Sequence, residues 1–286
     1  MAVRVGFIGL GNIGKPMAER LVAGGLDTVV FDVRADARAA LGERGARIAG
    51  SCAEVARSAD VIGICVRDDA DVRAVTMGPD GVVAHARADS IIAIHSTILP
   101  GTVREIGSLA AQRGVGVVDA PVTGAAVGAE TGTLTYMVGG PAELVDRCRP
   151  VFATAAGRIV HTGALGSGAI AKLCNNLMGY LGFLAAYEAT LLAETSGLSF
   201  EAMVEVTRGG HLTELMHGFA GFRRRIGERP DDAALQARAL AFTDLAEKDL
   251  AVTLAFAREQ GITLPGTALC QQLMARVYGI RDDRRR

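Results

Sequence analysis

Short apolar runs alternate with amphipathic stretches through the first part of the chain. Strand-like runs rich in valine and isoleucine, most of them ending at or beside glycine, aspartate or serine, are residues 3–9, 28–32, 61–66, 91–95, 115–119 and 136–139. Helical spacing is found between them at residues 13–23, 35–44, 53–57, 71–75 and 103–113. This alternation predicts an α/β fold with a doubly wound, mostly parallel sheet.

The pattern changes after about residue 160, where the strand signal stops. Helical patterning continues through residues 164–196, 200–208, 212–225, 234–259 and 265–278. Pro265 suits the first position of a helix, where its missing N–H costs nothing. We therefore expect an N-terminal domain at residues 1–162 and an all-helical C-terminal domain at residues 163–286, joined by a long helix.

The apolar stretch 173–193 has about the 20 residues that a membrane span requires. Asn175, Asn176 and Glu188 interrupt it, and neither an aromatic belt nor a basic flank marks its ends. The stretch is therefore expected to be a buried core helix.

Composition and charge narrow the class of protein. A formal net charge of -1 over 286 residues gives no electrostatic reason to expect a nucleic-acid partner, and the basic run 281–286 is expected to be a solvated tail. Five cysteines are scattered without the paired spacing of a zinc site or disulfide framework, which favours a reduced, cytoplasmic setting and no metal. The N-terminus shows no signal-peptide pattern.

A glycine-rich motif follows the first predicted strand and precedes a predicted helix. Its residues are Gly9-Leu10-Gly11-Asn12-Ile13-Gly14, a G-x-G-x-x-G pattern in the context that dinucleotide binding requires. Gly9 allows a tight turn, and Gly11 lets backbone amides approach a pyrophosphate at the helix N-terminus. Gly14 permits close packing of the helix on the sheet. The motif predicts a bound dinucleotide cofactor.

Asp32 follows the second predicted strand, about 20 residues after the glycines. A carboxylate at this place can accept hydrogen bonds from the ribose hydroxyls and repels a 2'-phosphate, which favours NAD over NADP. Arg34 could instead turn towards such a phosphate, so the sequence leaves NADP as an alternative.

Lys172 is the only charged residue between Gly163 and Tyr187. In a helix, Asn175 and Asn176 lie beside it on the same face. Desolvation would lower the pKa of the lysine and suit it to proton transfer, whereas the alternative is an ammonium that extends to solvent from a helix edge.

Two histidines compete with this lysine as proton carriers. His95 ends a predicted strand, and the sequence favours a hydrogen-bonded structural role for it. His161 lies just before the long helix and is expected to be a cap or loop residue.

Three further segments carry a family resemblance. Residues 119–125 (Asp-Ala-Pro-Val-Thr-Gly-Ala), continued by 132–134, resemble the substrate-binding signature of the β-hydroxyacid dehydrogenases, the family of 3-hydroxyisobutyrate dehydrogenase and tartronate semialdehyde reductase. Residues 163–176 resemble its catalytic signature, and residues 248–250 its Lys-Asp-Leu element. The resemblance covers nearly the whole chain and implies a Rossmann-type domain followed by a helical one, as in 6-phosphogluconate dehydrogenase-like enzymes.

The resemblance assigns the chemistry to a few residues. It implies that Lys172 is the catalytic lysine and Asn176 a substrate ligand, with Asn175 beside it. Thr123 and Gly124 would bind the substrate carboxylate through a hydroxyl and a backbone N–H.

Cofactor contacts are implied in the same way. Thr97 is similar to the threonine that lines the nicotinamide site, and Lys248 would close over cofactor and substrate. The family commonly has Leu-Pro where this chain has Val66 and Arg67, so Arg67 either contacts the cofactor or caps the loop. The family's Ser-Gly-Gly is replaced here by Thr123-Gly124-Ala125, which leaves the substrate's identity open.

The resemblance implies an NAD-dependent oxidoreductase that interconverts a short 3-hydroxy acid and its semialdehyde, with Lys172 as general acid and base. It also implies a homodimer or homotetramer. An imine reductase or reductive aminase is an alternative, against which Lys172 and Asp32 argue. A non-catalytic dinucleotide-binding module is another, and it would be expected to lose Lys172 or Asn176.

Overall fold

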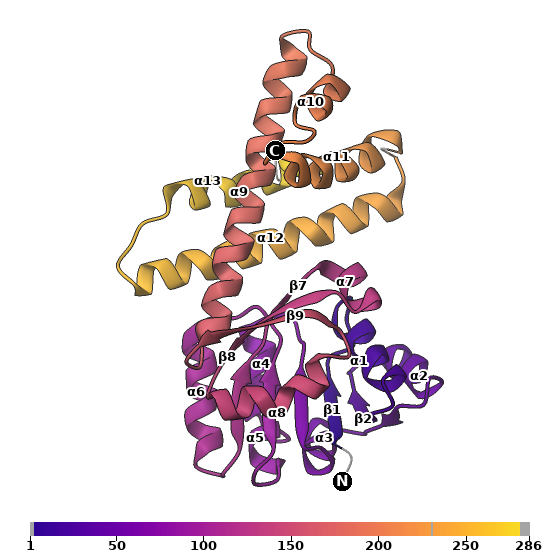
Figure 1. Ribbon diagram of the computed structural model, residues 1–286, viewed down its shortest axis with the longest axis vertical. Helices are drawn as coiled ribbons and strands as arrows, with labels where there is room; N and C mark the ends of the chain where they lie inside the picture. The colour runs from indigo at the N-terminus through magenta and orange to yellow at the C-terminus, as the bar shows by residue number, and fades with distance from the viewer. Residues whose placement is uncertain (1–2, 230, 281–286) are drawn as a thin grey trace. The chain divides into compact units, whose positions relative to one another are not determined.

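The computed structural model describes residues 3–229 and 231–280 (Figure 1). The chain divides into two compact units, Met1–Lys172 and Leu173–Arg286, and the division falls inside helix α9 (Ser167–Thr195). The basic run 281–286 lies outside the described residues. An α/β unit followed by a helical unit confirms the predicted fold class.

The first unit is built on one mostly parallel sheet in the order β3-β2-β1-β4-β5-β6-β8-β7, with β9 paired to β8. Strand β8 is antiparallel to β6 and β7 and parallel to β9, and the other pairs are parallel. The strands are β1 (Arg4–Ile8), β2 (Asp27–Phe31), β3 (Arg47–Ile48), β4 (Val61–Ile64), β5 (Ile91–Ile94), β6 (Gly116–Asp119), β7 (Val122–Thr123), β8 (Leu134–Gly139) and β9 (Ala156–Gly163).

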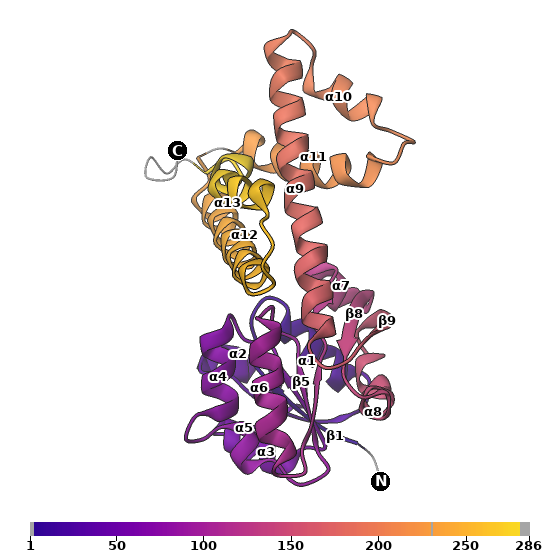
Figure 2. The same ribbon diagram turned by 90° about the vertical axis from the view of Figure 1, so that its left-hand side faces the viewer.

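Helices cover both faces of this sheet, because its central strands are apolar on both sides. All four residues of β5 are fully buried, as expected for a central parallel strand. One face packs against α1 (Gly14–Ala23), α2 (Ala35–Gly42), α7 (Ala125–Thr131) and α8 (Ala142–Phe152). The other packs against α3 (Cys52–Ser58), α4 (Asp69–Met77), α5 (Val82–His85) and α6 (Pro100–Ala111), so that α6 and α8 lie on opposite sides of the strands in Figure 2.

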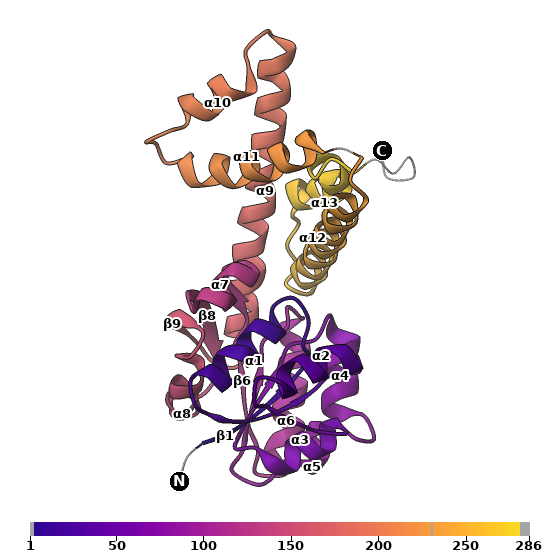
Figure 3. The same cartoon turned by 90° about the vertical axis from the view of Figure 1, so that its right-hand side faces the viewer.

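The second unit is helical and has its own core. It contains most of α9 with α10 (Phe200–Val206), α11 (Thr213–Glu228), α12 (Ala233–Glu259) and α13 (Pro265–Val277), of which α12 and α13 lie side by side (Figure 3). Phe219, Leu250, Cys270 and Met274 are among its fully buried side chains. Across the described ranges, we find no helix long and apolar enough to cross a membrane.

Several elements of the first unit were not predicted. Strand β9 carries the sheet past residue 160, and its residues are half-buried or exposed, so it lacks the apolar run that marks a buried strand. His161, expected in a cap or loop, lies in β9, where its Nε2 is 2.8 Å from the Gly140 carbonyl oxygen. Strands β3 and β7 have two residues each, too few for a pattern.

Candidate active site

The glycine motif forms the turn between β1 and α1, and its three glycines face different surroundings. A Cβ on Gly9, whose φ is +94°, would lie 2.2 Å from the Cys65 carbonyl oxygen, and one on Gly14 would lie 2.0 Å from the Gly9 carbonyl oxygen. A Cβ on Gly11 would meet nothing within 4 Å. Folding therefore requires glycine at the first and third positions but not at Gly11, where the open surface fits a ligand that approaches the backbone.

The start of α1 is suited to an anion. No side chain caps this ten-residue helix, and its first turn carries no acidic residue. Leu10 is buried, whereas Gly11 and Asn12 are exposed at the helix entrance beside Ile13. Uncapped N–H groups at the positive end of a helix bind phosphate oxygens, so the observed loop fits a dinucleotide pyrophosphate.

Asp32 ties the end of β2 to the glycine motif. Its Oδ2 accepts a 2.6 Å hydrogen bond from the Leu10 backbone N–H, and its Oδ1 accepts one of 2.8 Å from the Arg34 backbone N–H. The Arg34 guanidinium donates to the Leu10 carbonyl at 2.8 Å and lies 3.5 Å from Asp32. Asp32 thus stands beside the motif as predicted, and Arg34, the alternative ligand for a 2'-phosphate, is turned towards the Asp32 carboxylate.

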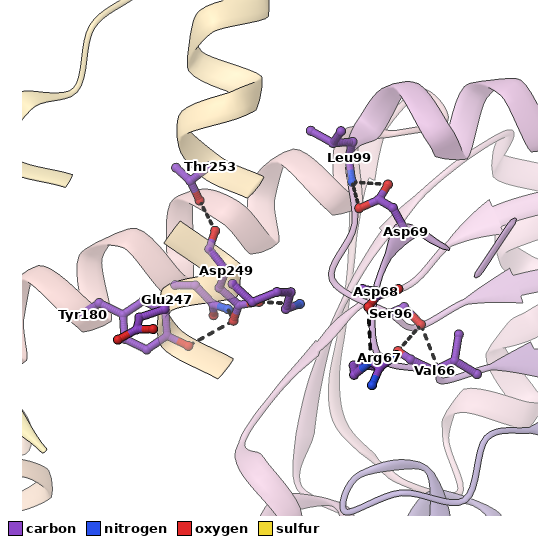
Figure 4. A network of polar contacts seen from close by, with 12 residues as sticks. Val66, Arg67, Asp68, Asp69, Ser96, Leu99, Tyr180, Glu247, Asp249 and Thr253 are labelled. Atoms are coloured by element: carbon purple, nitrogen blue, oxygen red, sulfur yellow. Dashed lines mark hydrogen bonds and ion pairs between the residues drawn. The ribbon is translucent and has the colours of Figure 1, made fainter. Parts of the chain in front are cut away.

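Polar side chains fix the loops that follow β4 and β5 (Figure 4). The buried Ser96 hydroxyl accepts from the Val66 N–H at 2.9 Å and donates to the Val66 carbonyl at 2.8 Å. Asp69 accepts from the Leu99 N–H at 3.1 Å and from a threonine hydroxyl of α6. These bonds hold the backbone on either side of the half-buried Thr97.

Arg67 is exposed and pairs with the first turn of α4. Its Nε lies 3.2 Å from Asp68 and 3.4 Å from Asp71. Asp68 is the N-cap of that helix. Arg67 thus makes local ion pairs at the start of α4, and its contact with a cofactor stays a prediction.

His95 is a core residue. Its ring packs against Phe7, Tyr136 and Phe152, and Nδ1 is 2.8 Å from the Ala120 carbonyl oxygen. Burial lowers the pKa of His95 to about 4. The imidazole is therefore neutral near pH 7 and serves packing.

Asp119 holds the beginning of α9. Its carboxylate is buried at the end of β6 and accepts hydrogen bonds from the Gly166 N–H at 2.8 Å and the Ala169 N–H at 2.7 Å. Burial raises the pKa of Asp119, an effect that the surrounding backbone N–H groups oppose. A Cβ on Gly168 would lie 2.3 Å from the Met137 carbonyl oxygen, so a glycine is required where the helix contacts the sheet.

Lys172 follows one turn later on α9 and is half-buried. Burial raises the pKa of the Cys65 thiol to about 12, and the charge of Lys172 opposes that rise. Asp119, which binds the start of this helix, ends β6, and β6, β5, β4 and β1 are parallel, so the carboxyl ends of β6 and β1 lie at the same edge of the sheet. The first unit thus brings Lys172 to the edge of the sheet where the glycine motif begins.

Thr123, Gly124 and Ala125 lie where β7 leads into α7. Thr123 is half-buried, and Gly124 is exposed with a φ of +125°. Ala125 has a φ of +56°, a left-handed conformation that costs a residue with a Cβ about 1–2 kcal/mol. The family motif has glycine at this position. Ala125 therefore adds a methyl group and also strains the backbone.

Asn176 belongs to the second unit, where Asp249 of α12 holds it. Asn176 Nδ2 donates to Asp249 Oδ2 at 2.7 Å. The Tyr180 hydroxyl donates to the same oxygen at 3.0 Å (Figure 4). Lys248 Nζ lies 2.7 Å from Asp249 Oδ1. Asn175 Nδ2 lies 3.4 Å from Asn176 Oδ1.

The predicted site residues therefore form two groups, one in each unit. The first unit holds the glycine motif with Asp32, Val66, Arg67, Thr97, Thr123, Gly124 and Lys172. The second joins Asn175, Asn176 and Lys248 through Asp249. No role was predicted for Asp119, Ser96 or Asp249. A signal for Asp249 was present in the sequence, because it is a charged residue on the buried face of a helix and lies in the Lys-Asp-Leu element.

Two family models match the chain in succession. The NAD binding domain of 6-phosphogluconate dehydrogenase matches residues 4–163. The model described as NAD-binding of NADP-dependent 3-hydroxyisobutyrate dehydrogenase matches residues 166–283. Together they cover both units.

Relatives match over the same length. A 3-hydroxyisobutyrate dehydrogenase of Pseudomonas aeruginosa is 34% identical over 278 residues, 95% of this chain and 91% of that protein. The chain belongs to the β-hydroxyacid dehydrogenase family. An uncharacterized oxidoreductase of Mycobacterium tuberculosis is 38% identical over 281 residues, 97% of this chain and 94% of the relative. The solved structure of Mycobacterium tuberculosis 3-hydroxyisobutyrate dehydrogenase with L-serine superposes with a TM-score of 0.80 at 29% identity, covering 98% and 94% of the two chains.

As a β-hydroxyacid dehydrogenase, the protein is an NAD(P)-dependent oxidoreductase that acts on a hydroxy acid. The predictions of the family, the enzyme class and an NAD(P) cofactor are confirmed.

Proposed function

We propose that the protein oxidises a short 3-hydroxy acid to its semialdehyde with NAD, using Lys172 as general base, and catalyses the reverse reaction with Lys172 as general acid. The observation that carries this proposal is the position of Lys172. Lys172 lies one turn after the start of α9, which Asp119 holds at the carboxyl end of β6, the edge of the sheet where the glycine motif also begins.

Each step is assigned to groups of this chain. Thr123 and Gly124 bind the carboxylate through a hydroxyl and a backbone N–H, which sets the position of the reacting alcohol. When bound, NAD supplies the hydride acceptor. Lys172 Nζ takes the hydroxyl proton as the alcohol carbon becomes a carbonyl, and Asn176 orients the hydroxyl. In reduction, Lys172 returns the proton to the carbonyl oxygen.

The chain's own residues favour NAD. The glycine motif with Thr97 and Val66 would hold the cofactor in the first unit, and Lys248 would contribute from the second. Asp32 stands where a ribose is expected, and the Arg34 guanidinium already bonds to the Leu10 carbonyl. A carboxylate in this place disfavours a 2'-phosphate.

A binding measurement tests the cofactor site without relying on turnover. Gly11→Ala should fold with an unchanged melting temperature, since its Cβ meets no atom, but should weaken NADH binding about tenfold or more in a fluorescence titration. Gly14→Ala is the matched variant and should lower the melting temperature, because its Cβ collides with the Gly9 carbonyl. NADH binding to Gly11→Ala with wild-type affinity would contradict the assignment.

A substrate panel tests the reaction. The panel contains 3-hydroxyisobutyrate, serine, glycerate, 3-hydroxypropionate and 4-hydroxybutyrate, each with NAD and with NADP. We expect kcat/KM to be highest for a 3-hydroxy acid with NAD and Thr123→Ala to raise KM for that substrate. Turnover of 4-hydroxybutyrate alone, or an unchanged KM in Thr123→Ala, would refute the substrate assignment.

We also propose that the first unit is the NAD-binding domain and that the second contributes substrate contacts and self-association into a homodimer or homotetramer. Large apolar side chains are exposed on the second unit, among them Met178, Leu191, Leu192 and Val206. Light scattering should give a multiple of 29.7 kDa for the wild type and a smaller mass for Leu192→Asp. The five free cysteines support a reducing compartment such as the cytoplasm.

A further inference from the structure

Asp249 is a carboxylate in the buried stripe of α12. Its side chain is 3% exposed, and the stripe continues at Thr243, Ala246, Leu250 and Thr253, which are also buried. A carboxylate in such a place is costly unless other groups satisfy it. Its contacts therefore carry information about its role.

Those contacts come from side chains rather than from the helix backbone. Asn176 Nδ2 and the Tyr180 hydroxyl both donate to Oδ2, and the Lys248 ammonium lies 2.7 Å from Oδ1. Burial raises the pKa of Tyr180, and the charge of Asp249 raises it further, so the phenol stays protonated and donates. One carboxylate thus joins two residues that the family signatures single out, Asn176 and Lys248.

A buried carboxylate removes an ambiguity from the Asn176 side chain. An amide carries an acceptor oxygen and a donor NH2 group of nearly equal shape, so it can fit many sites in either of two orientations. An ionised carboxylate only accepts, and it therefore selects the orientation in which Nδ2 faces Asp249. The same orientation points the Asn176 amide oxygen away from Asp249.

We propose that Asp249 is a positioning residue that fixes the Asn176 amide in the one orientation that can hold the reacting alcohol. This inference rests on the proposed function, which gives Asn176 its contact with the substrate. Asp249 contributes no proton and touches no reacting atom. It acts through the 2.7 Å bond to Asn176 Nδ2.

The test is a double-mutant cycle between Asp249→Asn and Asn176→Ala, measured with the best substrate of the panel. Asparagine keeps the shape of Asp249 but can present either an oxygen or an NH2 group, so it no longer selects one orientation of Asn176. We expect Asp249→Asn to lower kcat about tenfold or more. In the Asn176→Ala background, the same substitution should change kcat by less than about twofold.

Tyr180→Phe is the matched control. It removes the other hydrogen bond to the same oxygen and leaves the bond to Asn176 in place. It should lower the melting temperature while kcat stays within about twofold of wild type. An equal loss of kcat in Tyr180→Phe and Asp249→Asn would overturn the proposal, because any disturbance of the carboxylate would then have the same effect. Equal effects of Asp249→Asn in both backgrounds would overturn it as well.

A readout independent of activity separates this inference from the proposed function. In NMR spectra, the side-chain amide signal that Asn176→Ala removes is the signal of Asn176. The Asn176 side-chain amide protons should exchange with water at least about tenfold more slowly in the wild type than in Asp249→Asn. Identical exchange rates would refute the role of Asp249 even if the enzyme turns over a 3-hydroxy acid. Protection in an enzyme that turns over no member of the panel would support Asp249 and refute the proposed function.

Discussion

Helix α9 is held by a buried aspartate in each unit, and the two aspartates hold it differently. Asp119 accepts hydrogen bonds from the backbone N–H groups of Gly166 and Ala169, whereas Asp249 accepts from the side chains of Asn176 and Tyr180. A helix fixes the direction of its own backbone amides, but a side-chain amide can rotate. Loss of the first carboxylate should therefore cost mainly stability, and loss of the second mainly orientation.

The two carboxylates also differ in electrostatic surroundings. Asp119 is surrounded by backbone dipoles, and burial raises its pKa. Asp249 has the Lys248 ammonium 2.7 Å away. Lys172 follows the part of α9 that Asp119 holds, and Asn176 lies in the part that Asp249 holds.

The largest effect is expected for Lys172→Ala. This substitution removes the amine on the part of α9 that Asp119 holds. Loss of a general base should lower kcat by about 100- to 10,000-fold, or about 3–5 kcal/mol, while NADH affinity stays within about twofold. Cys174→Ala, an exposed neighbour on α9, is the control and should keep wild-type kinetics. Steady-state assays and NADH titration measure both variants, and unchanged turnover in Lys172→Ala would exclude the lysine as proton carrier.

A smaller effect, on stability, is expected for Gly168→Ala. The new Cβ would lie 2.3 Å from the Met137 carbonyl oxygen, so the start of α9 must move, at a cost of about 2–4 kcal/mol. Gly179→Ala changes the same helix where a Cβ meets nothing within 4 Å, and should stabilise it by about 0.5–1 kcal/mol. Denaturant unfolding compares the two. If both variants shifted the free energy of unfolding alike, the first turn of α9 would not be a tight contact.

The smallest effect is the pH dependence that Asp119 contributes. Because the pKa of Asp119 is raised in the folded protein, folding favours its protonated form. Its contribution to stability is fully present below the ordinary carboxyl value of 3.8 and decreases as the pH rises through the raised value. The melting temperature of the wild type minus that of Asp119→Asn should therefore fall by a few degrees as the pH rises from about 3 towards neutrality. A difference that grew over this range would show that the carboxylate is favoured when ionised.

Local parts of the site could be predicted from the sequence, because a strand, a turn and a helix involve only neighbours in the chain. The glycine motif and Asp32 belong to this class. Lys172 is a candidate because it is the one charge in an apolar stretch, and its catalytic role stays a prediction. Among 30 lysines and arginines, only Lys15, Lys172 and Lys248 are lysines, so two of the three fall in family signatures.

Long-range pairings could not be predicted. Asp249 and Asn176 are 73 residues apart, and Asp119 and Ala169 are 50 apart, so residue spacing does not indicate that they meet. The charge signal that marked Lys172 also marks Asp249, which interrupts a buried stripe at a spacing of three to four residues. In the fold, β9 was missed because its residues are half-buried or exposed and so lack an apolar run.

The most direct test of the two-anchor account measures melting temperature and kcat together for Asp119→Asn and Asp249→Asn. Asp119→Asn should show the larger loss of melting temperature. Asp249→Asn should show the larger loss of kcat, assayed at a temperature well below the melting transition of either variant. The reverse ranking on both measurements would contradict it, because the backbone anchor would then control chemistry and the side-chain anchor stability.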